Sequence, residues 1–268
     1  MTRAVVLGGG GLTAIAWLDG LLSGLPPVLP GADRVIGTSG GALLAARLLS
    51  GGTGEGLDDV AAELSGVRVT ALAAARLAVA QVWPSRRHAL IWLGRTGRLP
   101  GGPAHSGLTE ERFVDLVGRA VGTDDWPDAL VVVAVDAAAG RPAYFTARSG
   151  VPLARAVAAG CAMPGVLPTV TIDGRRFLDG GLRTPANADL ATGSDRVLIL
   201  APQSRSIREV RRPGHEASRL RAAGAGVALI EDEHPNWSVM SAAALPAARE
   251  RGRRAGRAAS DAVARLWA

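Results

Sequence analysis

The sequence contains no lysine, and all 30 of its basic residues are arginines, giving a formal net charge of +6. A basic protein raises the question of a nucleic-acid partner. The arginines are dispersed along the chain, however, and the single tyrosine offers little for base stacking. We therefore attribute the arginine bias to overall composition and expect no nucleic-acid partner.

Cysteine and long hydrophobic runs are scarce as well. Cys161 is the only cysteine, so no disulfide can form within the chain, as is typical of a reducing compartment. No stretch of about 18 residues is free of charges and glycine breaks, so no membrane-spanning helix is expected. The apolar run at the start leads directly into four glycines. It is therefore too short and too quickly interrupted for a signal peptide. A cytoplasmic location is expected.

Glycine is abundant instead, with 35 of 268 residues. Apolar residues make up 48% and charged residues 20%, which excludes a largely disordered chain. Short apolar strands are expected at residues 3–7 and 34–38, and each is followed by a glycine-containing turn and a helix, at 12–22 and 40–49. Two short strands separated by a helix predict a parallel crossover and therefore an α/β fold.

The remaining pattern predicts further helices and strands. Residues 84–107 are rich in proline and glycine and are expected to form a long irregular segment. Asp173-Gly174 predicts a hairpin turn. Helices are expected at 55–82, 110–121, 153–160, 208–223 and 246–267, and strands at 129–135, 142–146, 169–172, 175–178, 196–200 and 226–230.

A possible nucleophile stands where the second strand meets its helix. Gly37-Thr38-Ser39-Gly40-Gly41 matches G-x-S-x-G, in which a serine occupies a sharp strand-to-helix turn and small neighbours prevent steric clashes. The pattern is short enough to arise by chance in a glycine-rich chain, so its position between a strand and a helix is what favours a catalytic role.

The four glycines Gly8–Gly11 follow the first strand and free its backbone to turn several amides toward one point. Such amides can stabilise a tetrahedral oxyanion. A competing interpretation is a dinucleotide site, because Gly9, Gly11 and Ala14 fit G-x-G-x-x-A. That motif requires an acidic residue after the second strand, where this chain has Thr38 and Ser39.

A serine nucleophile needs a base, and Asp179-Gly180-Gly181 is one candidate to supply it. It follows the second strand of the expected hairpin, from which a carboxylate can point toward the serine. The alternative is that these residues form only a turn. In a different serine hydrolase, with a Ser-Asp-His triad, His215 or His234 would complete the site.

Taken together and in this order, Gly8–Gly11, Gly37–Gly41 and Asp179–Gly181 resemble the patatin-like phospholipase family. The small-residue and proline-rich run 158–168 and Asn187-Ala188-Asp189 add to the resemblance. It covers residues 3–201. It implies a three-layer fold with a central, mostly parallel sheet flanked by helices. The expected organisation is one domain over 1–268, with 3–201 as its motif-bearing core and 202–268 as a C-terminal extension.

By this resemblance the protein is a lipid acyl hydrolase of the phospholipase, lysophospholipase or esterase type. Ser39 would be the nucleophile, Asp179 its base in a dyad without histidine, and the amides of Gly9, Gly10 and Gly11 the oxyanion hole. The flanking glycines Gly37, Gly41, Gly180 and Gly181 complete the motifs. No cofactor and no metal ion are expected. A non-catalytic binding protein of the same fold stays open as an alternative.

Two features bear on substrate and partner. The family's glycine motif usually continues with a basic residue and glycine, where this chain has Thr13 and Ala14. Two segments could contact an anionic membrane surface: the tryptophans and arginines near residues 83–92, and the arginine-rich stretch Arg249–Arg257. The alternative is that the first segment covers the site and that the second is the solvated face of a helix.

Overall fold

The computed structural model describes residues 1–64, 67, 69–96, 108–203, 212–232 and 240–268. The strands are β1 (Arg3–Leu7), β2 (Arg34–Thr38), β3 (Leu130–Asp136), β4 (Arg141–Phe145), β5 (Val170–Ile172), β6 (Arg175–Asp179), β7 (Arg196–Ala201) and β8 (Gly226–Glu231). The helices are α1 (Gly11–Ser23), α2 (Gly40–Leu49), α3 (Asp58–Leu64), α4 (Ala71–Val82), α5 (Arg86–Thr96), α6 (Glu110–Val121), α7 (Leu153–Gly160), α8 (Pro213–Ala222) and α9 (Leu245–Trp267).

The strands form one mixed sheet in the order β5-β6-β3-β2-β1-β7-β8, and β4 also pairs with β3. Neighbouring strands from β3 to β8 in this order are parallel, whereas β4 and β6 run antiparallel to β3. The sheet is therefore mostly parallel, and the α/β fold expected from the sequence is confirmed.

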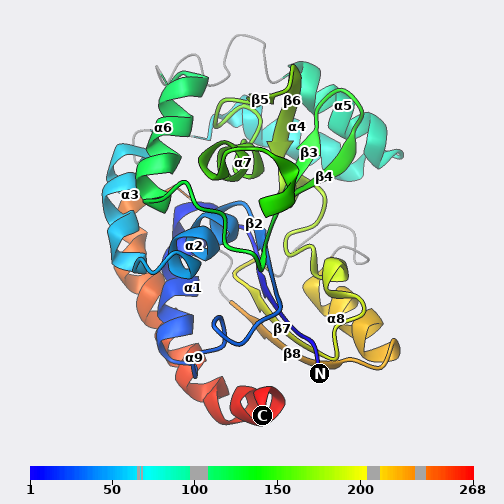
Figure 1. The fold of residues 1–268 in the computed structure, drawn as a ribbon. Helices are drawn as coiled ribbons and strands as arrows, with labels where there is room; N and C mark the ends of the chain where they lie inside the picture. The colour runs from blue at the N-terminus through cyan, green and yellow to red at the C-terminus, as the bar shows by residue number, and fades with distance from the viewer. Residues whose placement is uncertain (65–66, 68, 97–107, 204–211, 233–239) are drawn as a thin grey trace.

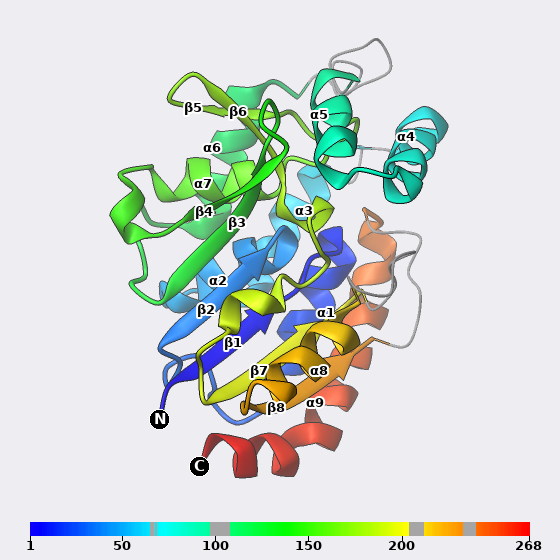
Figure 2. The ribbon, with the colours of Figure 1, turned by 90° about the vertical axis from the view of Figure 1, so that its right-hand side faces the viewer.

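Helices cover both faces of the sheet, which gives three layers (Figures 1 and 2). Val5 and Leu7 of β1 contribute to the larger core, which is shared with α1, α2, α6, α7 and α9. Ala4 and Val6 point to the other face and pack with α8 and the segment that precedes β7. Both faces of the central strands are buried, which explains why they are apolar without alternation.

A third apolar cluster lies under α4 and α5 and includes Leu178 of β6.

The prediction of an irregular segment is wrong for residues 86–96, which form α5. Residues 97–107 of that segment lie outside the described ranges. The prediction of one continuous helix over 55–82 is also wrong, because α3 ends at Leu64 and α4 begins at Ala71. The other expected elements are confirmed with small shifts of their ends, except that residues 208–211 are not described.

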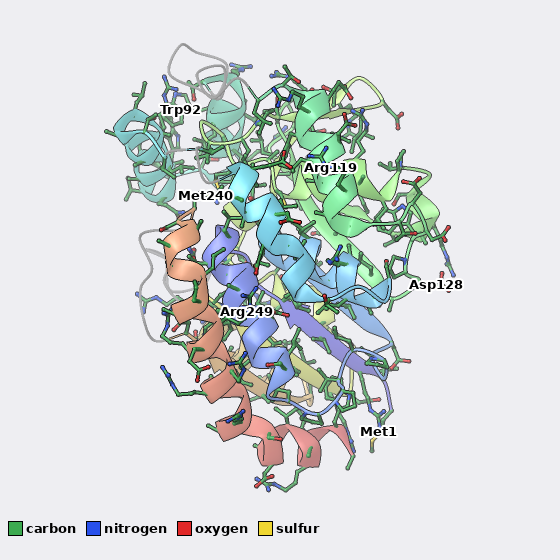
Figure 3. All side chains as sticks on the ribbon, turned by 90° about the vertical axis from the view of Figure 1, so that its left-hand side faces the viewer. Met1, Trp92, Arg119, Asp128, Met240 and Arg249 are labelled. Atoms are coloured by element: carbon green, nitrogen blue, oxygen red, sulfur yellow. The ribbon has the colours of Figure 1, made fainter. Side chains whose placement is uncertain are left out.

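The C-terminal helix α9 lies along α1, as Figure 3 shows around the labelled Arg249. Glycines permit this close approach: a Cβ atom placed on Gly252 would lie 2.0 Å from the carbonyl oxygen of Trp17. Arg249 forms ion pairs with Asp19 of α1 at 2.9 Å and Asp58 of α3 at 2.8 Å.

None of the helices within the described ranges combines the length and the apolar character needed to span a membrane.

Candidate active site

Ser39 occupies a sharp turn between β2 and α2. Its backbone has φ 51° and ψ −128°, a strained conformation for a residue with a side chain. A Cβ atom on Gly37 would lie 2.4 Å from Cα of Ala42, and one on Gly41 would lie 2.3 Å from the carbonyl oxygen of Leu7. The turn therefore requires glycine at both positions, which is the physical content of the G-x-S-x-G pattern.

Asp179 reaches Ser39 through the register of two strands that run in opposite directions. Thr38, which precedes the serine, pairs with Val133 of β3, and Asp179 pairs with Ala134, the next residue of β3. The end of antiparallel β6 is therefore level with the end of parallel β2, on the other side of β3. The two side chains meet although they are 140 residues apart in the sequence.

The two side chains are joined directly. The Ser39 hydroxyl donates to Oδ2 of Asp179 at 2.7 Å, and the Gly181 amide donates to Oδ1 at 2.7 Å. Gly180 permits the approach, because a Cβ atom there would lie 2.3 Å from the carbonyl oxygen of Val133. One carboxylate oxygen is thus held by the backbone while the other faces the hydroxyl.

Burial changes the acid–base properties of this site. Asp179 is 1% exposed and Ser39 is 8% exposed. Burial raises the pKa of Asp179 to about 6, although the hydrogen bonds from Ser39 and Gly181 oppose the shift. Burial and the nearby Asp179 carboxylate raise the pKa of the Cys161 thiol well above its usual value, so this thiol beside Ser39 stays protonated.

The glycine loop passes close to Ser39, since a Cβ atom on Gly9 would lie 3.1 Å from that of Ser39. The Gly9 amide donates to the Pro185 carbonyl at 2.9 Å, so it already has a partner in this structure, and its expected role in an oxyanion hole stays a prediction. Gly10 and Gly11 have φ 151° and 69°, and within the described ranges no hydrogen bond engages their amides. These two amides are the remaining candidates.

Asn187 connects the two sides of the site. Its side chain is fully buried; Nδ2 donates to Oγ1 of Thr38 at 3.0 Å and to the Gly180 carbonyl at 3.3 Å, and Oδ1 accepts from Arg183 at 2.8 Å. Its φ of 58° is left-handed, a conformation that asparagine tolerates well. The sequence marked this residue only through the resemblance of its motif, and no local pattern reveals that it bridges the residues beside Ser39 and Asp179.

We expect replacement of Asn187 by aspartate to lower kcat at least tenfold. Aspartate keeps the size and the acceptor for Arg183 but cannot donate to Thr38 and Gly180. Buried donors and acceptors that lose their partners cost about 1–3 kcal/mol each. Steady-state kinetics and chemical denaturation on the same preparation measure this, with Asp189→Asn, at a half-buried partner of Arg183, as control. Unchanged kcat in a folded Asn187→Asp variant would contradict the bridging role.

A family model described as "Patatin-like phospholipase" matches residues 5–192. The chain belongs to the patatin-like phospholipase family. Among solved structures, this patatin-like chain is similar to the type III effector protein ExoU, with 18% identity and a TM-score of 0.40 over 96% of this chain and 52% of that one. VipD from Legionella pneumophila matches with 12% identity and a TM-score of 0.46 over 97% of this chain and 67% of that one. The chain spans about half the length of ExoU. A comparison with curated proteins finds no match.

The positions where this patatin-like chain departs from the family pattern line a small cleft beside the glycine loop. Thr13 and Ala14 line it together with Gly10, Pro202, Gln203 and Asp232. Thr13 is buried, so its hydroxyl replaces the family's cation in a position with little exposure to water.

The histidines expected for a triad give no support to that alternative. His215 lies on α8, and among the described residues no hydrogen bond joins it to Ser39 or Asp179. His234 lies outside the described ranges.

Proposed function

We propose that this protein is a serine acyl hydrolase that cleaves carboxylic ester bonds of lipids through a Ser39–Asp179 dyad. Membership of the patatin-like phospholipase family supports a lipid acyl hydrolase. The observation that carries the dyad is the 2.7 Å hydrogen bond from the buried Ser39 hydroxyl to the buried Asp179 carboxylate. A carboxylate is a weak base toward a hydroxyl in water, and partial removal from water makes it a stronger one.

The proposed reaction has two steps. As Ser39 Oγ forms a bond to the ester carbonyl carbon, its proton moves to Asp179, and the amides of Gly10 and Gly11 stabilise the negative charge on the carbonyl oxygen. The bond to the alcohol then breaks, and that alcohol leaves with the proton from Asp179. Water attacks the acyl-serine in the same manner, with Asp179 accepting its proton, and releases the carboxylic acid and free Ser39.

We also propose that residues 1–268 act as one domain and that the protein is cytoplasmic. The strand β8 of the C-terminal extension continues the central sheet beside β7, and α9 packs along α1. These contacts support an extension that is integral to the fold.

We expect a fluorophosphonate probe to label Ser39 at a rate that rises as the pH increases through about 6. Asp179 acts as a base only when ionised, and burial raises its pKa to about 6, so labelling is lost below that pH. Peptide mass spectrometry locates the adduct, and the rate is measured from pH 4.5 to 8.5.

Two variants test this assignment. Ser39→Ala should show no adduct at this peptide. Glu216 is buried on α8, accepts from the Ala188 amide at 3.2 Å and has its pKa raised by burial to about 7, so it titrates in the same range. Glu216→Gln should leave the pH profile in place. A profile that moves in Glu216→Gln, or labelling that does not depend on pH, would argue against Asp179 as the base.

A further inference from the structure

Helix α4 is apolar but largely exposed to water. All its residues except Arg76 and Gln81 are apolar, yet only Ala73 and Ala80 are buried. Leu72, Val79 and Val82 are 46%, 45% and 61% exposed. An apolar helix of a water-soluble protein normally buries such side chains, and a contiguous exposed group of them marks a binding surface.

The exposed side chains share one face of the helix. Leu72, Ala75, Val79 and Val82 follow the three- and four-residue spacing that places residues on one side. We call these four residues the α4 face. Figure 2 shows α4 at the margin of the molecule, beside α5 and away from the sheet, so that no described element covers the α4 face.

The sequence segment that carries the α4 face has charges of one sign only. The sequence contains no aspartate or glutamate between Glu63 and Glu110. Within the described part of this stretch, Arg76 donates to the carbonyl oxygen of Thr96 and Arg87 to that of Ala139. Because a carbonyl oxygen is neutral, these hydrogen bonds do not neutralise the arginine charges. The same stretch carries Arg86 and Arg95 on α5. An anionic surface complements this charge, whereas a second copy of the same face would be repelled by it.

Two tryptophans lie next to the α4 face. Trp83 follows α4 directly and Trp92 lies on α5, and their ring centroids are 5.4 Å apart; Figure 3 labels Trp92. Tryptophan is favoured at the boundary between lipid chains and headgroups, because its ring is apolar and its N–H is polar. Apolar side chains, tryptophans and arginines without acids are the composition of a helix that lies in a lipid interface.

The buried side of α4 packs on segments that are close in the sequence to residues of the candidate active site. Ala73 packs on Gly165, in the turn that leads away from Cys161, and a Cβ atom on Gly165 would lie 2.9 Å from that of Ala73. Ala80 belongs to the same apolar cluster as Leu178, which directly precedes Asp179. The buried side of α4 thus packs in the same apolar cluster as the end of the strand that carries Asp179.

We propose that the α4 face docks the protein on an anionic lipid surface. Leu72, Val79 and Val82 enter the boundary between headgroups and acyl chains, while the arginines of α4 and α5 face lipid phosphates. This inference rests on the proposed function, since it makes the docked surface the source of the ester substrate. It also explains why the sequence keeps an apolar helix exposed to water.

The test is vesicle binding by the full chain carrying Ser39→Ala, so that binding is measured without hydrolysis. We expect sedimentation with phosphatidylserine-containing vesicles, at least tenfold weaker binding to pure phosphatidylcholine, and further weakening with added salt. Adding Leu72→Ser, Val79→Ser and Val82→Ser should lower binding to anionic vesicles at least tenfold. The matched control is Tyr144→Ser, at a side chain that is 41% exposed on β4, which should bind as before.

A water-soluble short-chain ester separates the docking proposal from the hydrolase proposal. With Ser39 intact, the triple serine variant should cleave this ester at the unmodified rate. Vesicle binding that the triple variant retains, or equal binding to neutral and anionic vesicles, would overturn the docking proposal while leaving the hydrolase proposal intact. Absence of ester cleavage together with normal vesicle binding would overturn the hydrolase proposal and leave vesicle docking intact. A dimer that the triple variant disrupts, or binding of soluble polyglutamate in place of vesicles, would assign the face to a protein partner and overturn the lipid proposal.

Discussion

Replacing Asp179 with asparagine is expected to abolish most activity and at the same time to stabilise the fold at pH 8. Loss of the base should lower kcat/KM by about 10²–10⁴-fold. The pKa of Asp179 is raised in the folded protein from 3.8 to about 6, so the ionised carboxylate is unfavourable there. A shift of this size corresponds to about 3 kcal/mol of unfolding free energy at pH values well above 6, and the penalty disappears below about pH 4.

Asparagine avoids this penalty because it is neutral and keeps an oxygen for the Gly181 amide. We expect urea denaturation to give an unfolding free energy about 1–3 kcal/mol higher than that of the unmodified protein at pH 8, and nearly equal values at pH 4. Ester hydrolysis is measured on the same preparations. A variant that is less stable at pH 8 would show that Asp179 is not held in an unfavourable ionised state.

Asp136 provides a control of opposite sign. It is also buried, but it accepts from the amides of Ala138 and Ala139 and pairs with Arg175, and the net effect is a lowered pKa despite the opposing effect of burial. The ionised Asp136 carboxylate therefore stabilises the fold at pH values above its pKa in the unfolded chain. This contribution to stability is lost as the pH falls. Asp136→Asn should lower the unfolding free energy at pH 8, in contrast to Asp179→Asn.

Replacing Gly252 with alanine is expected to destabilise the protein by about 3 kcal/mol, the upper part of the range for overpacked cores. In an exposed helix the same change would be favourable by about 1 kcal/mol. Here the added methyl group would lie 2.0 Å from the carbonyl oxygen of Trp17, and α9 would have to move away from α1. Gly20 and Gly256 face the opposing backbone equally closely, so a shift at one position disturbs all three contacts.

Gly118 on α6 is the matched control. A Cβ atom there would meet only the Ala154 side chain, at 3.4 Å, an ordinary packing distance. Gly118→Ala should therefore raise the unfolding free energy by about 0.5–1 kcal/mol. Thermal and urea denaturation of both variants measure the difference. Equal effects of the two substitutions would contradict the close contact between α1 and α9.

The sequence predicts the central sheet well because its strands are short apolar runs between glycine-rich turns. It fails at α5, where proline and glycine predict an irregular segment. Pro84 precedes the helix and does not interrupt it, and Gly94 lies within it because a Cβ atom would come within 2.8 Å of the Ala137 carbonyl oxygen. Glycine here serves helix packing, and a sequence pattern does not distinguish that use from a turn.

In the candidate site, motifs locate Ser39 and Asp179, but contacts between distant segments escape them. The Gly9 amide is taken by Pro185, a residue that enters the site from a different loop. Gly40 lies so close to the glycine loop that a Cβ atom would be 2.9 Å from the Gly11 carbonyl oxygen. Neither contact has a local pattern, because each depends on how two loops pack.

The separation of Ser39 and Asp179 by 140 residues also has a consequence for biosynthesis. Ser39 and its turn emerge early from the ribosome, whereas Asp179 follows only at the end of β6, and β3 must be in place to set its register. A slip of one residue between β3 and β6 would turn the carboxylate to the opposite face of the sheet. A nascent chain released before β6 therefore carries its serine without a base, and the proposed lipid hydrolysis begins only after these strands have paired.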